Sequence, residues 1–193
     1  MQKPLLVAVS MLSLLYAAPP AAAQVDSRMV GTVTALPDNR TGKDFVQSTM
    51  TSSKFAIEAS KFALNRSRDP AIQGIARDTI AFHVKFQKDL KSVTDRIFIN
   101  RRVTPPPVLN TSQKKMYNLL EIKHGPAFDS LYTSQQLDTH LELLETVEGY
   151  ANHSKVPKLQ AFARRELPAV RDQLARLRGI GTNVAVNVPD DRY

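Results

Sequence analysis

Two histidines, His83 and His140, occupy positions in apolar stripes where an ordinary helical bundle would carry Leu or Val. The first stripe repeats at intervals of four and three residues and comprises Ile72, Ala76, Thr79, His83, Phe86, Leu90 and Val93. The second alternates between intervals of three and four and comprises Leu137, His140, Leu144, Val147 and Ala151. Such spacing is typical of one face of an α-helix, so it predicts that both imidazoles face the core of a bundle.

Glu58 lies on a further amphipathic segment and adds a carboxylate to the two imidazoles. Imidazole and carboxylate groups that face one another inside a bundle can bind a first-row metal ion. We therefore name Glu58, His83 and His140 as candidate metal ligands. The alternative, which we favour, needs no cofactor: a structural polar cluster in which Glu58 accepts hydrogen bonds from the imidazoles and Thr79 or Gln173 completes the network.

Other motifs are explained by ordinary helix chemistry. Glu121 and His124 form one Glu-x-x-His motif at the end of a predicted helix, where the helix dipole favours a histidine. Three glutamates recur every three residues, as on a solvated helix face: Glu142, Glu145 and Glu148. No Ser-His-acid arrangement or phosphate-binding glycine loop stands out. We therefore assign no catalytic residue.

The first residues have the parts of a secretory signal peptide. Lys3 precedes an apolar run from Leu5 to about Ala18, and the small residues Ala21 and Ala23 suit a cleavage site. The run is short for a bilayer span, which takes about 20 apolar residues. We predict a cleaved signal peptide and a periplasmic protein whose mature chain has no transmembrane segment.

Composition narrows the functional classes further. The sequence has no Cys, which excludes disulfides and thiolate chemistry. Its formal net charge of +8 falls to +7 when Lys3 is removed with the signal peptide. Nucleic acid is not an expected partner of an exported protein. The positive charge therefore points to an anionic envelope surface or an acidic protein partner.

Periodicity and helix-start signals predict four long helices and one short helix. The long helices are expected over residues 44–66, 70–96, 127–151 and 156–177, and the short one over 111–122, capped by Thr111 or Ser112. Asp44 and the pair Asp69–Pro70 are the other predicted start signals. Three consecutive prolines between Asn100 and Asn110 predict an exposed connection, and Pro168 predicts a bend in the last helix.

These elements predict an all-α fold, an antiparallel four-helix bundle with an extra short helix in the crossover and irregular termini. The expected division is a signal peptide at 1–23, an extended segment at 24–43, the bundle at 44–178 and a flexible tail at 179–193. Valines alternate in the tail, at Val184, Val186 and Val188, and similar residues occur at Val33 and Ala35. A short two-stranded pairing is thus the alternative to disorder, although isolated hairpins are marginally stable.

A series of short motifs resembles the bacterial family called domain of unknown function 4142 (DUF4142). In order, these are Asp44-Phe45, the segment from Phe55 to Ala63, Ile75-Ala76, Phe128-Asp129 with Tyr132, and Leu167-Pro168. The resemblance covers about residues 44–178. It implies a ferritin-like, exported helical bundle of a family commonly labelled as membrane or outer-membrane proteins without an established reaction.

The resemblance also implies which core residues matter. Glu58, His83 and His140 match a Glu and two His that members of the family tend to carry. Phe82 replaces an expected acidic neighbour of His83, and Gln173 stands where a His is expected after Leu-Pro. These two departures weaken the case for a four-ligand metal site.

The last predicted helix, with the residues just before it, is strongly basic and carries Lys155, Lys158, Arg164, Arg165, Arg171, Arg176 and Arg178. These cations are a candidate basic surface for anionic lipid, acidic polysaccharide or an acidic protein, against the simpler interpretation that they confer solubility. We rank three classes: a non-catalytic envelope interaction or stress-related protein, then a ferritin-like metal-binding protein, then an enzyme built on the same cluster. The sequence establishes neither a partner nor an oligomeric state.

Overall fold

The computed structural model describes residues 41–97 and 108–186 of the chain. The described residues form five helices: α1 (Gly42–Arg66), α2 (Pro70–Ile97), α3 (Thr111–Ile122), α4 (Gly125–His153) and α5 (Pro157–Val186). They confirm the predicted all-α fold. The signal peptide, most of the segment at 24–43, the proline-rich connection and the end of the chain lie outside the described residues.

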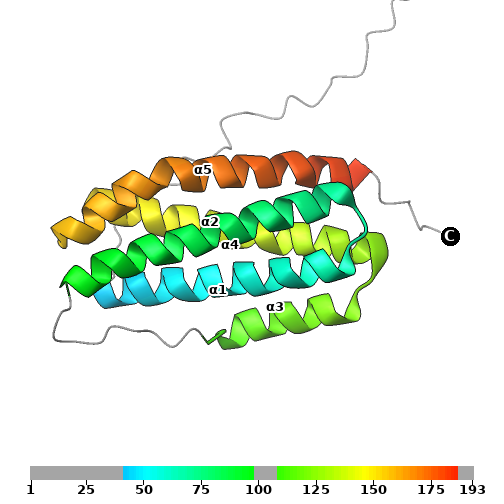
Figure 1. The fold of residues 1–193 in the computed structure, drawn as a ribbon, viewed down its shortest axis with the longest axis horizontal. Coiled ribbons are helices and arrows are strands. Elements are labelled where there is room, and N and C mark those ends of the chain that lie inside the picture. The colour runs from blue at the N-terminus through cyan, green and yellow to red at the C-terminus, as the bar shows by residue number, and fades with distance from the viewer. Residues whose placement is uncertain (1–40, 98–107, 187–193) are drawn as a thin grey trace, which may run out of the picture. The chain divides into compact units, whose positions relative to one another are not determined.

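The four long helices pack side by side around one core (Figure 1). α1 packs against α2 and α4, and α5 packs against the same two helices. α2 and α4 therefore face each other diagonally across the core. The short helix α3 lies outside this group, against α1 and α4.

The start of α2 agrees with its sequence signal, whereas α1 begins earlier than predicted. The Asp69 side chain accepts a hydrogen bond from the Ala71 amide at 2.7 Å, directly before Pro70. Thr41, not Asp44, is the N-cap of α1. Asp44 occupies the third helical position and binds back to the Thr41 amide, which completes a capping box. The prediction that Asp44 caps the helix is wrong, because this residue is the third-position partner of Thr41 in the capping box.

The boundaries around α3 and α4 also differ by a few residues. Asn110 caps α3, in place of Thr111 or Ser112, because its side chain reaches the Gln113 amide at 2.8 Å. α4 begins at Gly125 rather than near residue 127. Gly125 has a φ of 53°, a conformation that glycine adopts without strain, so the chain turns sharply between the two helices.

α5 continues to Val186, past the predicted end near Leu177. The predicted flexible tail therefore begins too early, and the alternative of a strand at Val184 and Val186 is wrong, since residues 179–186 belong to this helix. Gly181 explains part of the extension. A Cβ atom at this position would lie 3.2 Å from Leu137 Cδ1, so glycine allows α5 to approach α4 closely beyond the point where the apolar stripe ends.

The core consists of two apolar clusters. One contains Phe45, Phe86, Leu90, Leu143, Tyr150 and Phe162 among others, and the second contains Phe55, Ile72, Leu120, Phe128, Tyr132 and Leu177 among others. On each long helix, buried polar residues lie between these two sets. We call them the polar belt: Ser53, Thr79, His83, Gln136, His140 and Gln173. The belt contains both histidines that the apolar stripes singled out.

Candidate functional site

The centre of the polar belt is a contact between two imidazoles. His83 on α2 and His140 on α4 meet across the diagonal of the bundle, with their Nε2 atoms 3.1 Å apart. Both side chains are fully buried. The Phe82 ring lies 4.8 Å from the His83 ring and 6.1 Å from the His140 ring, measured between centroids, so an apolar side chain borders the pair.

The outer nitrogens determine which atoms carry protons. His140 Nδ1 lies 2.7 Å from the Gln136 carbonyl oxygen, which can only accept, so this nitrogen must donate. A neutral His140 then has an accepting Nε2, and His83 Nε2 donates to it. His83 Nδ1 is left to accept from the Ser53 hydroxyl at 3.0 Å. The pair therefore forms a directed chain from α1 to α2 to α4.

Both imidazoles are neutral at pH 7. Burial lowers the pKa of His83 well below its usual value, and the neighbouring His140 lowers it further. Burial also lowers the pKa of His140, to about 4, although the hydrogen bond to the Gln136 carbonyl opposes this shift. Neutral imidazole is the form that binds metal ions.

A second polar network connects all four long helices one turn away. Gln173 on α5 donates to Thr79 on α2 at 3.0 Å, and Thr79 also bonds to Tyr132 on α4. The Tyr132 hydroxyl lies 2.8 Å from the Ser60 hydroxyl on α1. Burial, only partly opposed by the bonds to Ser60 and Thr79, raises the pKa of Tyr132 to about 12, so the phenol stays protonated.

Glu58 does not join the two histidines, contrary to the expected cluster. Its side chain is 37% exposed and forms an ion pair with Lys61 at 3.3 Å. The reason is helical geometry, because Glu58 is five residues beyond Ser53 and therefore lies about 140° around α1 from the side chain that contacts His83. Ser53, not Glu58, is the residue of α1 that forms a hydrogen bond with His83.

Gln136 is a belt residue that sequence reasoning missed. Its side chain is completely buried, and neither amide atom has a hydrogen-bond partner among the described residues. It follows Tyr132 and precedes His140 at intervals of four residues, so the three share one face of α4. This four-residue spacing is the sequence pattern from which a buried Gln136 could have been predicted. The predicted apolar stripe instead passes through Leu137, the residue next to Gln136.

The remaining two histidines lie elsewhere. The exposed His124 accepts a hydrogen bond at Nδ1 from Arg66 at 2.7 Å, and Arg66 also donates to the Glu121 carbonyl oxygen. The Glu-x-x-His motif thus attaches α3 to the end of α1. His153 is exposed at the end of α4. In the part of the chain that the structure describes, no three or more His, Cys, Asp or Glu side chains are grouped closely enough to hold a metal ion.

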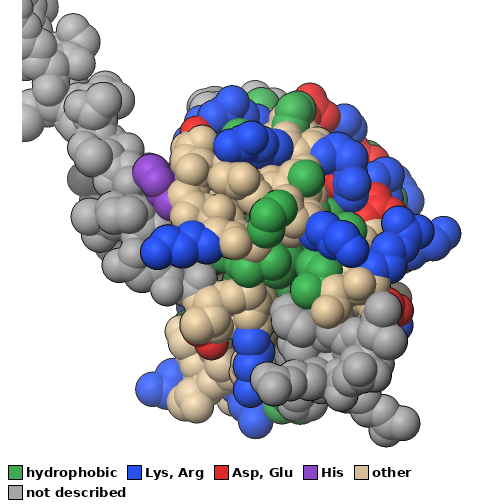
Figure 2. All heavy atoms as spheres, turned by 90° about the vertical axis from the view of Figure 1, so that its left-hand side faces the viewer, with side chains coloured by type: hydrophobic (Ala, Val, Ile, Leu, Met, Phe, Trp, Pro, Cys, Tyr) green, Lys and Arg blue, Asp and Glu red, His purple; other side chains and the backbone are tan. Residues whose placement is uncertain are grey.

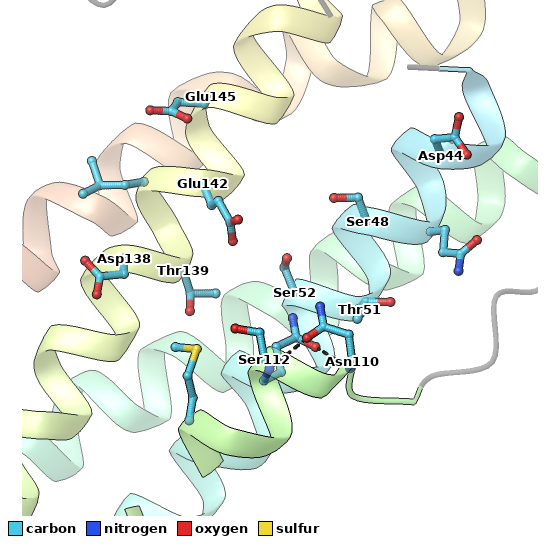
Figure 3. A pocket seen from close by; sticks show the side chains of 14 residues that line it. Asp44, Ser48, Thr51, Ser52, Asn110, Ser112, Asp138, Thr139, Glu142 and Glu145 are labelled. Atoms are coloured by element: carbon cyan, nitrogen blue, oxygen red, sulfur yellow. Dashed lines mark hydrogen bonds between the residues drawn. The ribbon is translucent and has the colours of Figure 1, made fainter. Parts of the chain in front are cut away.

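A surface groove of about 780 Å³ lies between α1, the start of α3 and α4 (Figure 3). It is lined mainly by polar side chains, which are Asp44, Gln47, Ser48, Thr51, Ser52, Asn110, Ser112, Gln113, Met116, Asp138, Thr139, Leu141, Glu142 and Glu145. Glu142 and Glu145 therefore border a concave surface rather than a plain solvated face. Periodicity could not show this groove, because α3 forms one of its walls.

The candidate basic surface is exposed but partly neutralised. All seven cations are exposed, but three of them pair with carboxylates: Arg165 with Glu166, Arg171 with Glu148, and Arg176 with Asp172 and Asp78. Arg164 donates to the Ala151 carbonyl oxygen at 2.9 Å. Figure 2 shows the end of the bundle where α5 begins, with Lys and Arg side chains spread around uncharged and hydrophobic atoms.

None of the helices in the described ranges is both long and apolar enough to cross a bilayer. The sequence profile of the DUF4142 domain of unknown function matches residues 29–180. No curated protein matches the sequence.

Two solved structures share the fold. CopM in its Cu(II)-bound form superposes with a TM-score of 0.61 and 15% identity, over 73% of this chain and 95% of CopM. A DUF305 protein from Streptomyces coelicolor that is described as secreted superposes with a TM-score of 0.60 and 13% identity, over 73% of this chain and 90% of that one.

Proposed function

The chain belongs to the DUF4142 family, and we propose that it is an exported metal-binding bundle that holds a first-row transition-metal ion between His83 and His140. The observation that carries this proposal is the contact between the two Nε2 atoms at 3.1 Å. Two ring nitrogens at this distance can bind one ion after a small change in geometry. The proposal thus keeps two of the three predicted ligands and leaves out Glu58.

The outer hydrogen bonds support metal binding by these two residues. A histidine that binds a metal ion usually donates its other ring N–H to a fixed acceptor, which sets the tautomer and orients the ring. His140 already has this arrangement through the Gln136 carbonyl. His83 reaches it if its proton is on Nδ1 and the Ser53 hydroxyl accepts instead of donating. A hydroxyl group makes this exchange by rotation alone.

Copper is the ion to test first, because one protein with the same fold was solved with Cu(II) bound. Export is supported by the signal-peptide pattern at 1–23 and by a second neighbour that is described as secreted. Both imidazoles are fully buried, so a substrate would not reach them without opening of the bundle. We therefore propose binding rather than catalysis.

Elemental analysis of protein purified without chelators or affinity-tag metals tests the proposal. The wild-type protein should retain or take up about one equivalent of metal, and His83→Gln and His140→Gln should each lose it. His124→Gln and His153→Gln are the matched controls, since both change an exposed histidine of the same chain. Wild-type protein that is folded but takes up no added copper, zinc or cobalt would refute the proposal.

A second candidate function is attachment of the basic surface to an anionic envelope component. Lys155, Lys158 and Arg178 are exposed and have no carboxylate within ion-pair distance among the residues described. Cations that are not neutralised by their own chain attract anionic surfaces in a salt-dependent way. This interaction needs no metal, so the two functions can be tested separately.

Cosedimentation with vesicles that contain anionic phospholipid tests the second candidate. Binding should fall as salt is raised, and a Lys155→Glu, Lys158→Glu variant should bind less. Arg171→Glu is the comparison, because Arg171 is already paired with Glu148. Binding that is unaffected by salt, or by the double charge reversal, would exclude an electrostatic role for this surface.

A further inference from the structure

The unpartnered amide of Gln136 requires an explanation. Its side chain is 0% exposed, and both its nitrogen and its oxygen have no hydrogen-bond partner among the described residues. Burying a polar group in this state is costly, and nearly all buried polar groups in folded proteins have a partner, an ordered water or an ion. By contrast, the amide nitrogen of Gln173, the other glutamine of the polar belt, donates to Thr79.

Gln136 also lies next to His140, one of the two histidines. It precedes His140 by one helical turn on the same face of α4. The His140 ring lies back over that turn, as its Nδ1 bond to the Gln136 carbonyl shows. The side chain of Gln136 therefore starts beside the imidazole whose Nε2 accepts the hydrogen bond from His83.

We infer that the amide oxygen of Gln136 is a third protein ligand of the ion held by His83 and His140, and that this ion is divalent. The inference rests on the proposed function and adds a ligand and a charge to it. Amide oxygen together with imidazole nitrogen is a borderline-to-hard donor set, which suits divalent copper, zinc or cobalt better than a monovalent soft ion.

The distance between the hydrogen-bonded histidines is compatible with the same choice. With metal–nitrogen bonds of about 2.0 Å, nitrogens 3.1 Å apart subtend an angle of about 100° at the ion. That angle is close to the tetrahedral and square-planar values and leaves room for further ligands. A linear two-coordinate ion would need the nitrogens about 4 Å apart by the same bond lengths.

Substitution of Gln136 tests the inference on the full-length mature protein. Gln136→Leu has a similar volume and removes the oxygen, so Co(II) and Cu(II) should bind more weakly, by at least the roughly 10- to 100-fold that loss of an outer-shell partner of a metal ligand costs. Gln136→Asn keeps the amide but shortens its reach, and it should weaken binding similarly while preserving the polarity of the site. Gln173→Leu is the matched control, because it removes a buried glutamine from the belt without removing a proposed ligand.

The visible spectrum of the Co(II) form gives a second readout, because its intensity depends on the coordination geometry. Gln136→Leu should change this spectrum, whereas Gln173→Leu should leave it as in the wild type. Unchanged affinity and spectrum in both Gln136 variants would overturn the inference while leaving metal binding by the histidines intact. Tighter binding of Ag(I) than of the divalent ions would overturn the assigned charge. No binding of any ion by the wild type would refute the proposed function itself.

Discussion

At the residue scale, the two core imidazoles respond to acid in a defined direction. Both have pKa values below that of a histidine in the unfolded chain, chiefly because of burial. As the pH falls below about 6.5, the unfolded chain binds protons that the folded protein does not, so stability falls with pH. The loss continues until the pH reaches the folded-state pKa, which is about 4 for His140.

We therefore predict that the metal-free protein loses about 2 kcal/mol of stability between pH 7 and pH 5 through His140 alone. Urea denaturation at the two pH values measures the loss. His140→Gln should reduce the difference, whereas His153→Gln, at an exposed position, should leave it unchanged. Equal pH dependence in all three proteins would show that the imidazole pair does not control acid sensitivity.

Tyr132 provides a prediction about the neighbouring network. Tyr132→Phe removes a hydroxyl that bonds to Ser60 and Thr79, so it should destabilise the protein by about 1 to 2 kcal/mol. Tyr117→Phe on α3 is the comparison, since Tyr117 is only partly buried. Thermal or urea melts distinguish them. A similar small effect of both variants would mean that the network adds no net stability.

The histidines were predictable at this scale, but their partners were not. A polar residue inside an apolar stripe is visible in the sequence, which is why His83 and His140 were found. Glu58 was included because it is acidic and matches the family pattern, yet it lies on another side of α1. Ser53 and Gln136 were missed because serine and glutamine are ordinary residues on exposed helix surfaces.

At the element scale, helix cores were predictable and helix ends were less so. Apolar periodicity depends on many residues and located all five helices of the described ranges, whereas each boundary depends on one side chain that competes with its neighbours for a few amides. Thr41 and Asn110 therefore replaced the expected caps. The last turns of α5 were missed because Gly179 and Gly181 are usual signs of a helix end.

A pair of glycine substitutions tests the extension of α5. A Cβ atom at Gly179 would contact nothing within 4 Å, and the same is true of Gly74 inside α2. Gly179→Ala should therefore stabilise the protein by about 0.5 to 1 kcal/mol, as Gly74→Ala should, because alanine favours the helix. Stabilisation by Gly74→Ala but none by Gly179→Ala, measured by urea denaturation, would place the end of the helix before residue 179.

At the scale of the whole molecule, the arrangement of the helices determines which residues can meet. The order of packing puts α2 and α4 on a diagonal, so only side chains long enough to reach the centre connect them. His83 and His140 do so at a level between two apolar clusters. The sequence alone predicts two polar positions but not their common level along the bundle. That level depends on how α2 and α4 are shifted relative to each other, and the two histidines are 57 residues apart in the chain.

Metal binding at this level should stabilise the whole bundle, since the ion would join diagonal helices in the folded state only. With free Cu(II) at about 100 times its dissociation constant, the expected gain is about 2.7 kcal/mol. For a chain of this size that corresponds to a rise of about 5 to 10 °C in Tm. Calorimetry with and without copper measures it. His83→Gln should show no rise, and an equal rise in that variant would place the ion elsewhere.

The complete burial of the histidine pair also has a kinetic consequence. Neither solvent nor an ion reaches the Nε2 atoms while the four helices are packed, so exchange at this position is timed by transient opening of the bundle. The time that the bundle takes to open is then a lower limit on the residence time of an ion at the pair. Such a protein would act as a slow reservoir of metal ions. Any partner that loosened the helices would control when an ion enters or leaves.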